Sequence, residues 1–184
     1  SIYRAWLNGE FLGCGPARAA HGFYRVDELD LSKKLRPGQN VLAIEVAGYN
    51  SNSFYLLDER SFLAAEVLAG ETAVAATGDK GFEAFVLAHR VQKVQRYSFQ
   101  RPFSEVWRLD VTSDAWRTGG KATAATLAAQ PALQTLDHHV PLPTFPTLAP
   151  KRTLSAGKLQ PVPPPARPWK DRSLTGIGPA LKGF

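Results

Sequence analysis

The sequence predicts an all-β protein made of antiparallel strands, and two turn motifs and a succession of short strand patterns support this prediction. The first motif is Asn8-Gly9, the dipeptide favoured in two-residue type I′ hairpins because both central residues need a positive φ. The second is Pro37-Gly38, in which proline presets φ at one turn position and glycine accepts a positive φ at the next. The chain is therefore expected to begin as an antiparallel β structure.

The strand patterns come in short pieces. After the second turn, Leu42, Ile44 and Val46 share one face and Glu45 lies on the other, which predicts a strand with one buried face. Residues 27–35 are predicted to hold a single helical turn. Regular short strands without long helical periods are typical of a sandwich or a barrel. The predicted strands are residues 2–7, 10–13, 22–26, 40–48, 54–57, 61–69, 72–76, 82–88, 94–99 and 104–111.

The proline content divides the chain at residue 137. Of the 14 prolines, 10 lie in residues 137–184, and the segments 140–146 and 161–168 are predicted to be extended polyproline II. We therefore expect a β-sandwich domain at 1–136 and a proline-rich linker at 137–184 that leads to a further domain. The absence of Met and the start at Ser1 within a strand pattern favour a piece of a longer polypeptide.

The net charge of +6 does not indicate nucleic-acid binding, because it is concentrated in the proline-rich segment. Residues 1–136 hold 15 basic and 14 acidic side chains, whereas residues 137–184 hold 7 basic and 2 acidic ones. No stripe of Lys and Arg with interleaved aromatic residues is present, so we expect no nucleic-acid partner. No apolar run approaches the roughly 18 residues of a membrane span and no signal peptide is visible, so no membrane partner is expected and the compartment stays open.

The acidic residues do not suggest a hydrolytic site. Glycoside hydrolysis needs two carboxyl groups flanking one bond. Asp27, Glu28 and Asp30 lie at a strand-to-turn junction, where acidic residues are common caps and turn formers. Glu45 and Glu66 are expected at the surface or paired with an arginine across the sheet. We therefore predict no catalytic residue in this chain.

The histidines and the single cysteine do not suggest a metal site. His138 and His139 follow Asp137 at the start of the proline-rich segment, and these three residues lack the ligands of a zinc site. They are interpreted as a polar start of the linker. Cys14 is expected to be a small buried apolar residue. No nucleophile elbow, Walker loop or dinucleotide motif is present, so no metal and no cofactor is expected.

A family pattern covers roughly residues 3–145. Its members are Tyr3, Asn8-Gly9, Gly13, Gly15-Pro16-Ala17-Arg18, Tyr24, Leu35, Gly38, Asn40 and Val46, followed by blocks at 48–55, 62–67, 96–105 and 139–143. This order resembles the jelly-roll accessory domain near the N-terminus of bacterial α-L-rhamnosidases, which are glycoside hydrolases. The resemblance implies a galactose-binding-like jelly-roll β-sandwich, an extended segment at 118–130, and an acid and base that lie in a catalytic domain downstream.

Two loops supply side chains suited to sugar contact, which calls for an aromatic face together with planar donors and acceptors. One loop spans residues 15–24 and the other residues 48–55, and loops at one end of a jelly roll can converge. The alternative interpretation is that these loops pack against the neighbouring catalytic domain. The sugar-contact candidates are Arg18, His21, Tyr49, Asn50, Asn52 and Tyr55.

Together these inferences predict a non-catalytic accessory module of a glycoside hydrolase, and the resemblance implies an α-L-rhamnosidase. Its expected partner is a catalytic domain of the same polypeptide, with carbohydrate as an open second partner. One alternative is a free-standing carbohydrate-binding module. Another is an interaction module whose proline segments are ligands, but Val140-Pro141-Leu142-Pro143 lacks the flanking arginine usual in such ligands.

Overall fold

The fold is all-β, with small sheets and one short 3₁₀ helix among the residues described. The computed structural model describes residues 1–48, 60–78, 81–91, 105–108, 114–120, 122–125, 128, 132–139 and 141–158. Within these parts of the chain, no helix combines the length and the apolar character that a membrane crossing requires. The strands of the described residues confirm the all-β part of the predicted fold class.

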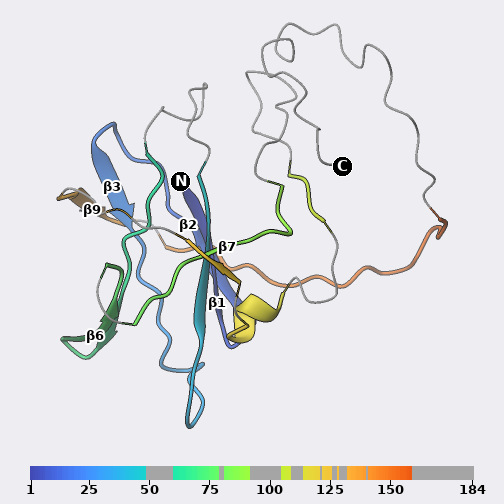
Figure 1. The fold of residues 1–184 in the computed structure, drawn as a ribbon, viewed down its shortest axis with the longest axis horizontal. Coiled ribbons are helices and arrows are strands. Elements are labelled where there is room, and N and C mark those ends of the chain that lie inside the picture. The colour runs from blue at the N-terminus through green and yellow to red at the C-terminus, as the bar shows by residue number, and fades with distance from the viewer. Residues whose placement is uncertain are drawn as a thin grey trace, which may run out of the picture.

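The central sheet has three antiparallel strands in the order β2-β1-β4 (Figure 1). These are β1 (Ile2–Leu7), β2 (Glu10–Gly15) and β4 (Leu42–Ala47). The turn between β1 and β2 has Asn8 at φ 53° and Gly9 at φ 83°, so the predicted Asn-Gly hairpin turn is confirmed. Gly38 likewise has φ 86°, as predicted for the second turn.

Three further pairs of strands complete the described sheet structure. β5 (Glu66–Ala69) and β6 (Thr72–Ala76) form an antiparallel hairpin, and β7 (Phe85–Val86) pairs antiparallel with β8 (Thr123–Ala124). In contrast, β3 (Phe23–Val26) pairs in parallel with β9 (Gln134–Asp137), so the expectation of purely antiparallel strands is wrong at this pair. The 3₁₀ helix η1 spans Ala115–Thr118 and contacts β4 and β1.

The predicted strands agree with β1 to β7 in position, although most observed strands are shorter. The predicted strands 54–57 and 94–99 lie outside the described residues. Of 104–111 only 105–108 is described, where Trp107 forms an isolated bridge with Arg90. The predicted helical turn is confirmed, since the backbone N–H groups of Lys34 and Leu35 both donate to the Leu31 carbonyl.

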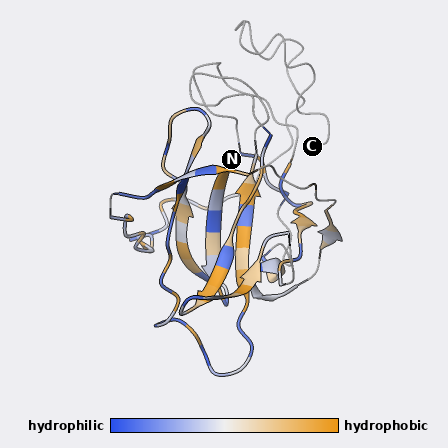
Figure 2. Cartoon of the chain, turned by 90° about the vertical axis from the view of Figure 1, so that its left-hand side faces the viewer, coloured by the Kyte–Doolittle hydropathy of each residue, from blue (hydrophilic) through white to orange (hydrophobic). Residues whose placement is uncertain are grey.

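The core is small and lies around β1. Ala5, Trp6 and Leu7 on β1 and Ala43 on β4 are the buried hydrophobic residues among those described. Apolar and polar residues alternate along the central strands (Figure 2). The prediction that Leu42, Ile44 and Val46 form the buried face of β4 is wrong in part, because Val46 is 36% exposed whereas Ala43 and Glu45 on the other face are buried. The latter face is covered by η1 and by the segment around Arg90.

Aromatic rings extend this core to the edge of the sheet and to the proline-rich segment. The Trp6 ring meets Phe11 and Trp116 edge-on, with centroid distances of 5.7 Å and 5.2 Å. Phe11 in turn meets Phe145 at 5.6 Å. Edge-on aromatic pairs at these distances stabilise a core beyond their apolar area alone. Part of the predicted linker thus contacts the first hairpin, although Phe145 is 38% exposed.

Cys14 differs from its prediction. It lies in β2 and is exposed, although a small buried residue was expected. Its register partner is Arg4, whose side chain turns toward Glu45 on β4, and β2 is an edge strand of the central sheet. Among the described residues, β2 has a neighbouring strand only at β1, so the Cys14 side chain is covered from one side less than a residue of a central strand.

Candidate functional site

The predicted sugar-contact loops leave the same end of the central sheet. Gly15, where β2 ends, is paired with Tyr3, and Ala47, where β4 ends, is paired with Ile2. The loops that follow these residues therefore begin near each other, as the prediction of a shared cleft requires.

The structure places two of the six candidate residues. Arg18 and His21 are exposed in the loop between β2 and β3, and the Arg18 carbonyl accepts a hydrogen bond of 2.9 Å from Nε of Arg25. Tyr49, Asn50, Asn52 and Tyr55 lie outside the described residues. The predicted cleft therefore stays a prediction, because four of its six residues lie outside the described part of the chain.

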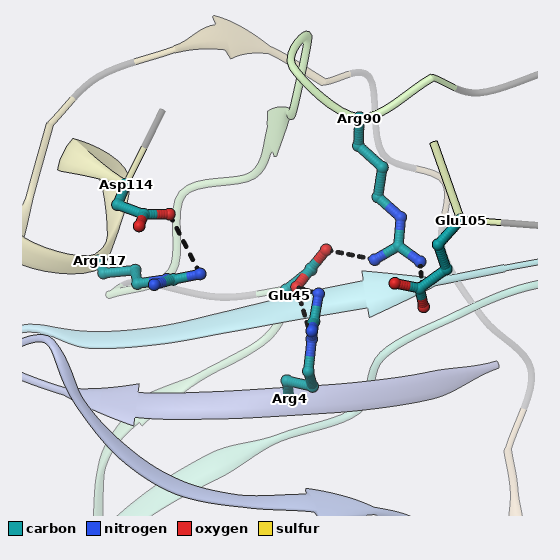
Figure 3. Close-up of polar contacts among 6 residues, drawn as sticks. All are labelled: Arg4, Glu45, Arg90, Glu105, Asp114 and Arg117. Carbon is teal, nitrogen blue, oxygen red and sulfur yellow. Dashed lines mark hydrogen bonds and ion pairs between the residues drawn. The ribbon is translucent and has the colours of Figure 1, made fainter. Parts of the chain in front are cut away.

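Glu45 is the centre of a buried ion-pair network (Figure 3). Its side chain is 3% exposed and lies between two arginines. Nε of Arg4 donates to Oε2 at 2.9 Å, and Nη2 of Arg4 lies 2.6 Å from the same oxygen as an ion-pair contact without hydrogen-bond alignment. Nη1 of Arg90 donates to Oε1 at 2.5 Å, and its Nη2 reaches Glu105 at 3.0 Å. The predicted alternative of a cross-strand arginine pair is confirmed, since Arg4 and Glu45 are register partners.

The arginines of this network also stack on aromatic rings. The guanidinium carbons of Arg4 and Arg90 lie 5.5 Å and 5.0 Å from the Trp107 ring centroid, within the range of a cation–π contact. His89 stacks on the same ring at 5.2 Å. Because three side chains contact the half-buried Trp107 ring, this ring packs within the fold and is not an open platform for a sugar.

A second buried carboxylate, Asp27, joins three distant parts of the chain. Its side chain is 2% exposed. The Tyr3 hydroxyl donates to Oδ2 at 2.6 Å, and Nδ1 of His138 lies 2.6 Å from Oδ1. An ionised carboxylate only accepts hydrogen bonds, so Nδ1 of His138 is the donor. The interpretation of His138 as part of a polar linker start is therefore wrong, because this ring is 11% exposed and holds β9 against the rest of the chain.

The other acidic residues of the junction behave as turn formers. Asp30 accepts hydrogen bonds from the backbone N–H and the hydroxyl of Ser32, and these bonds lower the pKa of the Asp30 carboxyl. The ion pair with Lys34 similarly lowers the pKa of Glu10. Among the described residues, no group of three or more His, Cys, Asp or Glu side chains is arranged to hold a metal ion.

Tyr3 should show its environment in the alkaline stability of the protein. Burial first, and then the hydrogen bond to Asp27, raise the pKa of the Tyr3 phenol above its ordinary value near 10. Since the folded state holds this proton more tightly, the stability contributed by Tyr3 is complete below about pH 10 and is lost as the pH rises further. We expect the difference in free energy of unfolding between the parent and Tyr3→Phe to shrink above about pH 10 in urea titrations at several pH values. A difference that stays constant with pH would contradict this.

Sequence reasoning missed the roles of Asp27 and His138, because their contact spans 111 residues. Gly15 is the residue that reflects this contact, because a Cβ atom at this position would overlap Oδ2 of Asp27.

Comparison of the chain with protein-family models, with curated proteins and with solved structures found no match.

Proposed function

We propose that this chain is a non-catalytic accessory module of a glycoside hydrolase, of the bacterial α-L-rhamnosidase type, with a jelly-roll β-sandwich as its fold. Its role is to hold a catalytic domain of the same polypeptide and to keep that domain in place. The order of the two turn motifs and of the sequence blocks that follow them supports this proposal, as does the antiparallel sheet of β2, β1 and β4.

The observation that carries the proposal is how the two most buried carboxylates of the described residues are used. Glu45 is held by two guanidinium groups, and Asp27 is held by a phenol and an imidazole. A glycosidase carboxyl group must instead face a bound sugar and remain able to gain or lose a proton there. Both carboxylates therefore support a structural role for this part of the chain.

The genomic sequence beyond the codon for Phe184 tests this proposal. We expect the reading frame to continue into a large helical domain that carries the acidic catalytic residues. With nitrophenyl α-L-rhamnosides and nitrophenyl β-galactosides, the isolated chain is expected to release nitrophenol no faster than buffer alone does. A stop codon directly after Phe184, or turnover that purified protein retains through several preparations, would overturn it.

A free-standing carbohydrate-binding module is the second candidate. The observation in its favour is the common origin of the two predicted loops at the end of the sheet marked by Gly15 and Ala47. Isothermal titration of the 184-residue chain against rhamnose, galactose and their disaccharides tests this candidate. Saturable heat that disappears in an Arg18→Ala variant supports it, and the absence of heat with every sugar excludes it.

A further inference from the structure

The two turn motifs interlock at the opposite end of the sheet from the predicted sugar-contact loops. Nδ2 of Asn8 donates to Oδ1 of Asn40 at 2.9 Å, and Oδ1 of Asn8 accepts from the backbone N–H of Val41 at 2.9 Å. The backbone N–H of Asn8 also donates to the Val41 carbonyl at 2.8 Å. The type I′ turn and the Pro-Gly turn are thus fixed to each other at two backbone positions and one side-chain pair.

Asn40 also fixes the shape of its own turn. Its Oδ1 accepts from the backbone N–H of Arg36 at 3.0 Å, and its Nδ2 donates to the carbonyls of Arg36 and Gly38 at 2.8 Å and 3.1 Å. With the bond from Asn8, the Asn40 amide uses its two donors and both acceptor positions. A fully satisfied amide of this kind holds the turn at 36–40 in one conformation before any ligand arrives.

The end of η1 adds the third wall. Gly9 approaches it closely, since a Cβ at Gly9 would lie 3.2 Å from Cγ2 of Thr118, and a Cβ at Gly119 would lie 3.5 Å from Cγ2 of Val41. The Asn8-Gly9 turn, the segment 36–41 and the end of η1 border a pocket that is open to solvent. Its volume of about 440 Å³ is within the usual range of small-molecule sites. We call it the turn pocket, and it is lined by Asn8, Arg36, Gln39, Val41, Thr118 and Gly119.

The turn pocket offers polar groups that are not used elsewhere in the described structure. Neither the Arg36 guanidinium nor the Gln39 amide makes a hydrogen bond or ion pair with another described residue. Thr118 donates its hydroxyl to the Ala115 carbonyl at 3.1 Å, which leaves the oxygen able to accept. The carboxylate of the neighbouring Glu10 forms its ion pair with Lys34 at 2.5 Å.

This combination of groups selects a class of ligand. A guanidinium presents a planar fork that matches a carboxylate in two parallel hydrogen bonds. An amide and a hydroxyl beside it suit the hydroxyl groups of a sugar. Among the described residues, no aromatic side chain lines the turn pocket, so recognition by these residues would depend on charge and hydrogen bonds rather than on stacking against a pyranose ring.

We propose that the turn pocket binds an acidic sugar, with Arg36 pairing with its carboxylate and Gln39 and Thr118 contacting its hydroxyl groups. The preformed turn lowers the ordering cost of binding. This site is separate from the predicted sugar-contact loops, and its existence does not depend on the role of the chain in a glycoside hydrolase.

Titration of the ¹⁵N-labelled 184-residue chain with D-galacturonate tests the proposal by amide chemical shifts. We expect saturable shifts at Arg36, Gln39, Thr118 and Gly119. Arg36→Gln should raise the Kd at least about tenfold, because a hydrogen-bonded charge contact is lost. Arg36→Lys, which keeps the charge and loses the fork, should fall between the two. Arg152→Gln removes the same charge from an exposed position of the proline-rich segment and should leave the Kd unchanged.

Three ligands separate the alternatives. D-galactose has the same ring without the carboxylate, and acetate and inorganic phosphate have the charge without the ring. The proposal predicts that galacturonate binds at least about tenfold more tightly than any of these, as expected for a lost charge-assisted contact. Equal affinity for galactose or for the simple anions would overturn it, as would the absence of saturable shifts at the turn pocket.

Discussion

Replacing Glu45 by glutamine is expected to lower the free energy of unfolding by about 3 kcal/mol, the lower end of the range found when one partner of a buried ion pair is removed, because Arg90 keeps its ion pair with Glu105. Glutamine preserves the shape of the side chain but leaves Arg4 and Arg90 without their shared anion. The effect falls mainly on Arg90, whose side chain is 16% exposed, because water screens the more exposed Arg4. Urea unfolding followed by tryptophan fluorescence measures this loss, since Trp6 and Trp107 both contact these arginines.

Glu66→Gln is the matched control for this experiment. Glu66 is an exposed strand residue on β5, so the same chemical change is expected to alter the free energy of unfolding by less than about 0.5 kcal/mol. A double-mutant cycle with Arg90→Met isolates the pair itself, and a coupling energy above about 0.5 kcal/mol is expected for groups in contact. If Glu45→Gln and Glu66→Gln have the same small effect, the Glu45 network does not stabilise the fold.

The sequence predicts the local geometry of this protein better than its contacts. Asn8-Gly9 and Pro37-Gly38 predict their turns because the requirement for positive φ is met by those residues alone. The bond between Asn8 and Asn40 joins positions 32 residues apart, and no local preference encodes it. The turn pocket that rests on this bond was therefore not predicted.

The burial of Glu45 shows the same limit. Alternation places it opposite Leu42, Ile44 and Val46, and a cross-strand arginine was an expected partner. The sequence pattern does not reveal that the segment around Arg90 covers this face and supplies a second guanidinium. The charged Glu45 is thus one of the most buried residues of β4, whereas Val46 on the apolar face is partly exposed.

The loops predicted to contact sugar illustrate what alternation can and cannot give. The Asn8-Gly9 turn accounts for the pairing of β1 with β2, whereas the pairing of β1 with β4 joins distant residues such as Arg4 and Glu45. This second pairing brings the ends of β2 and β4 to the same end of the sheet. The orientation of Arg18 and His21 depends on contacts of the loop itself, which the sequence pattern does not specify. The sequence therefore allowed the two loops to converge, but it specified neither the strand pairing that brings their origins together nor the geometry of a cleft.

Asp27→Ala is expected to lower the free energy of unfolding by about 2–4 kcal/mol, since it removes the acceptor of two part-buried donors, each loss costing about 1–3 kcal/mol. These donors are the Tyr3 hydroxyl and Nδ1 of His138. The loss should release β9 from β3 first, because His138 directly follows β9 and ties it to the loop after β3. Amide hydrogen exchange measures this: the substitution should increase the exchange rate more at β9 than at β1.

Glu28→Ala is the control, because Glu28 is the exposed neighbour of Asp27 and should change stability by less than about 0.5 kcal/mol. Gly15→Ala tests the same contact from the other side, since the added Cβ would overlap Oδ2 of Asp27. If the overlap with that oxygen is the main cost, Gly15→Ala should destabilise the Asp27→Ala variant less than it destabilises the parent. Part of the cost should persist, because the same Cβ would lie 3.0 Å from Cε1 of Tyr3. Strict additivity of the two substitutions would show that Gly15 is not required for the approach of Asp27.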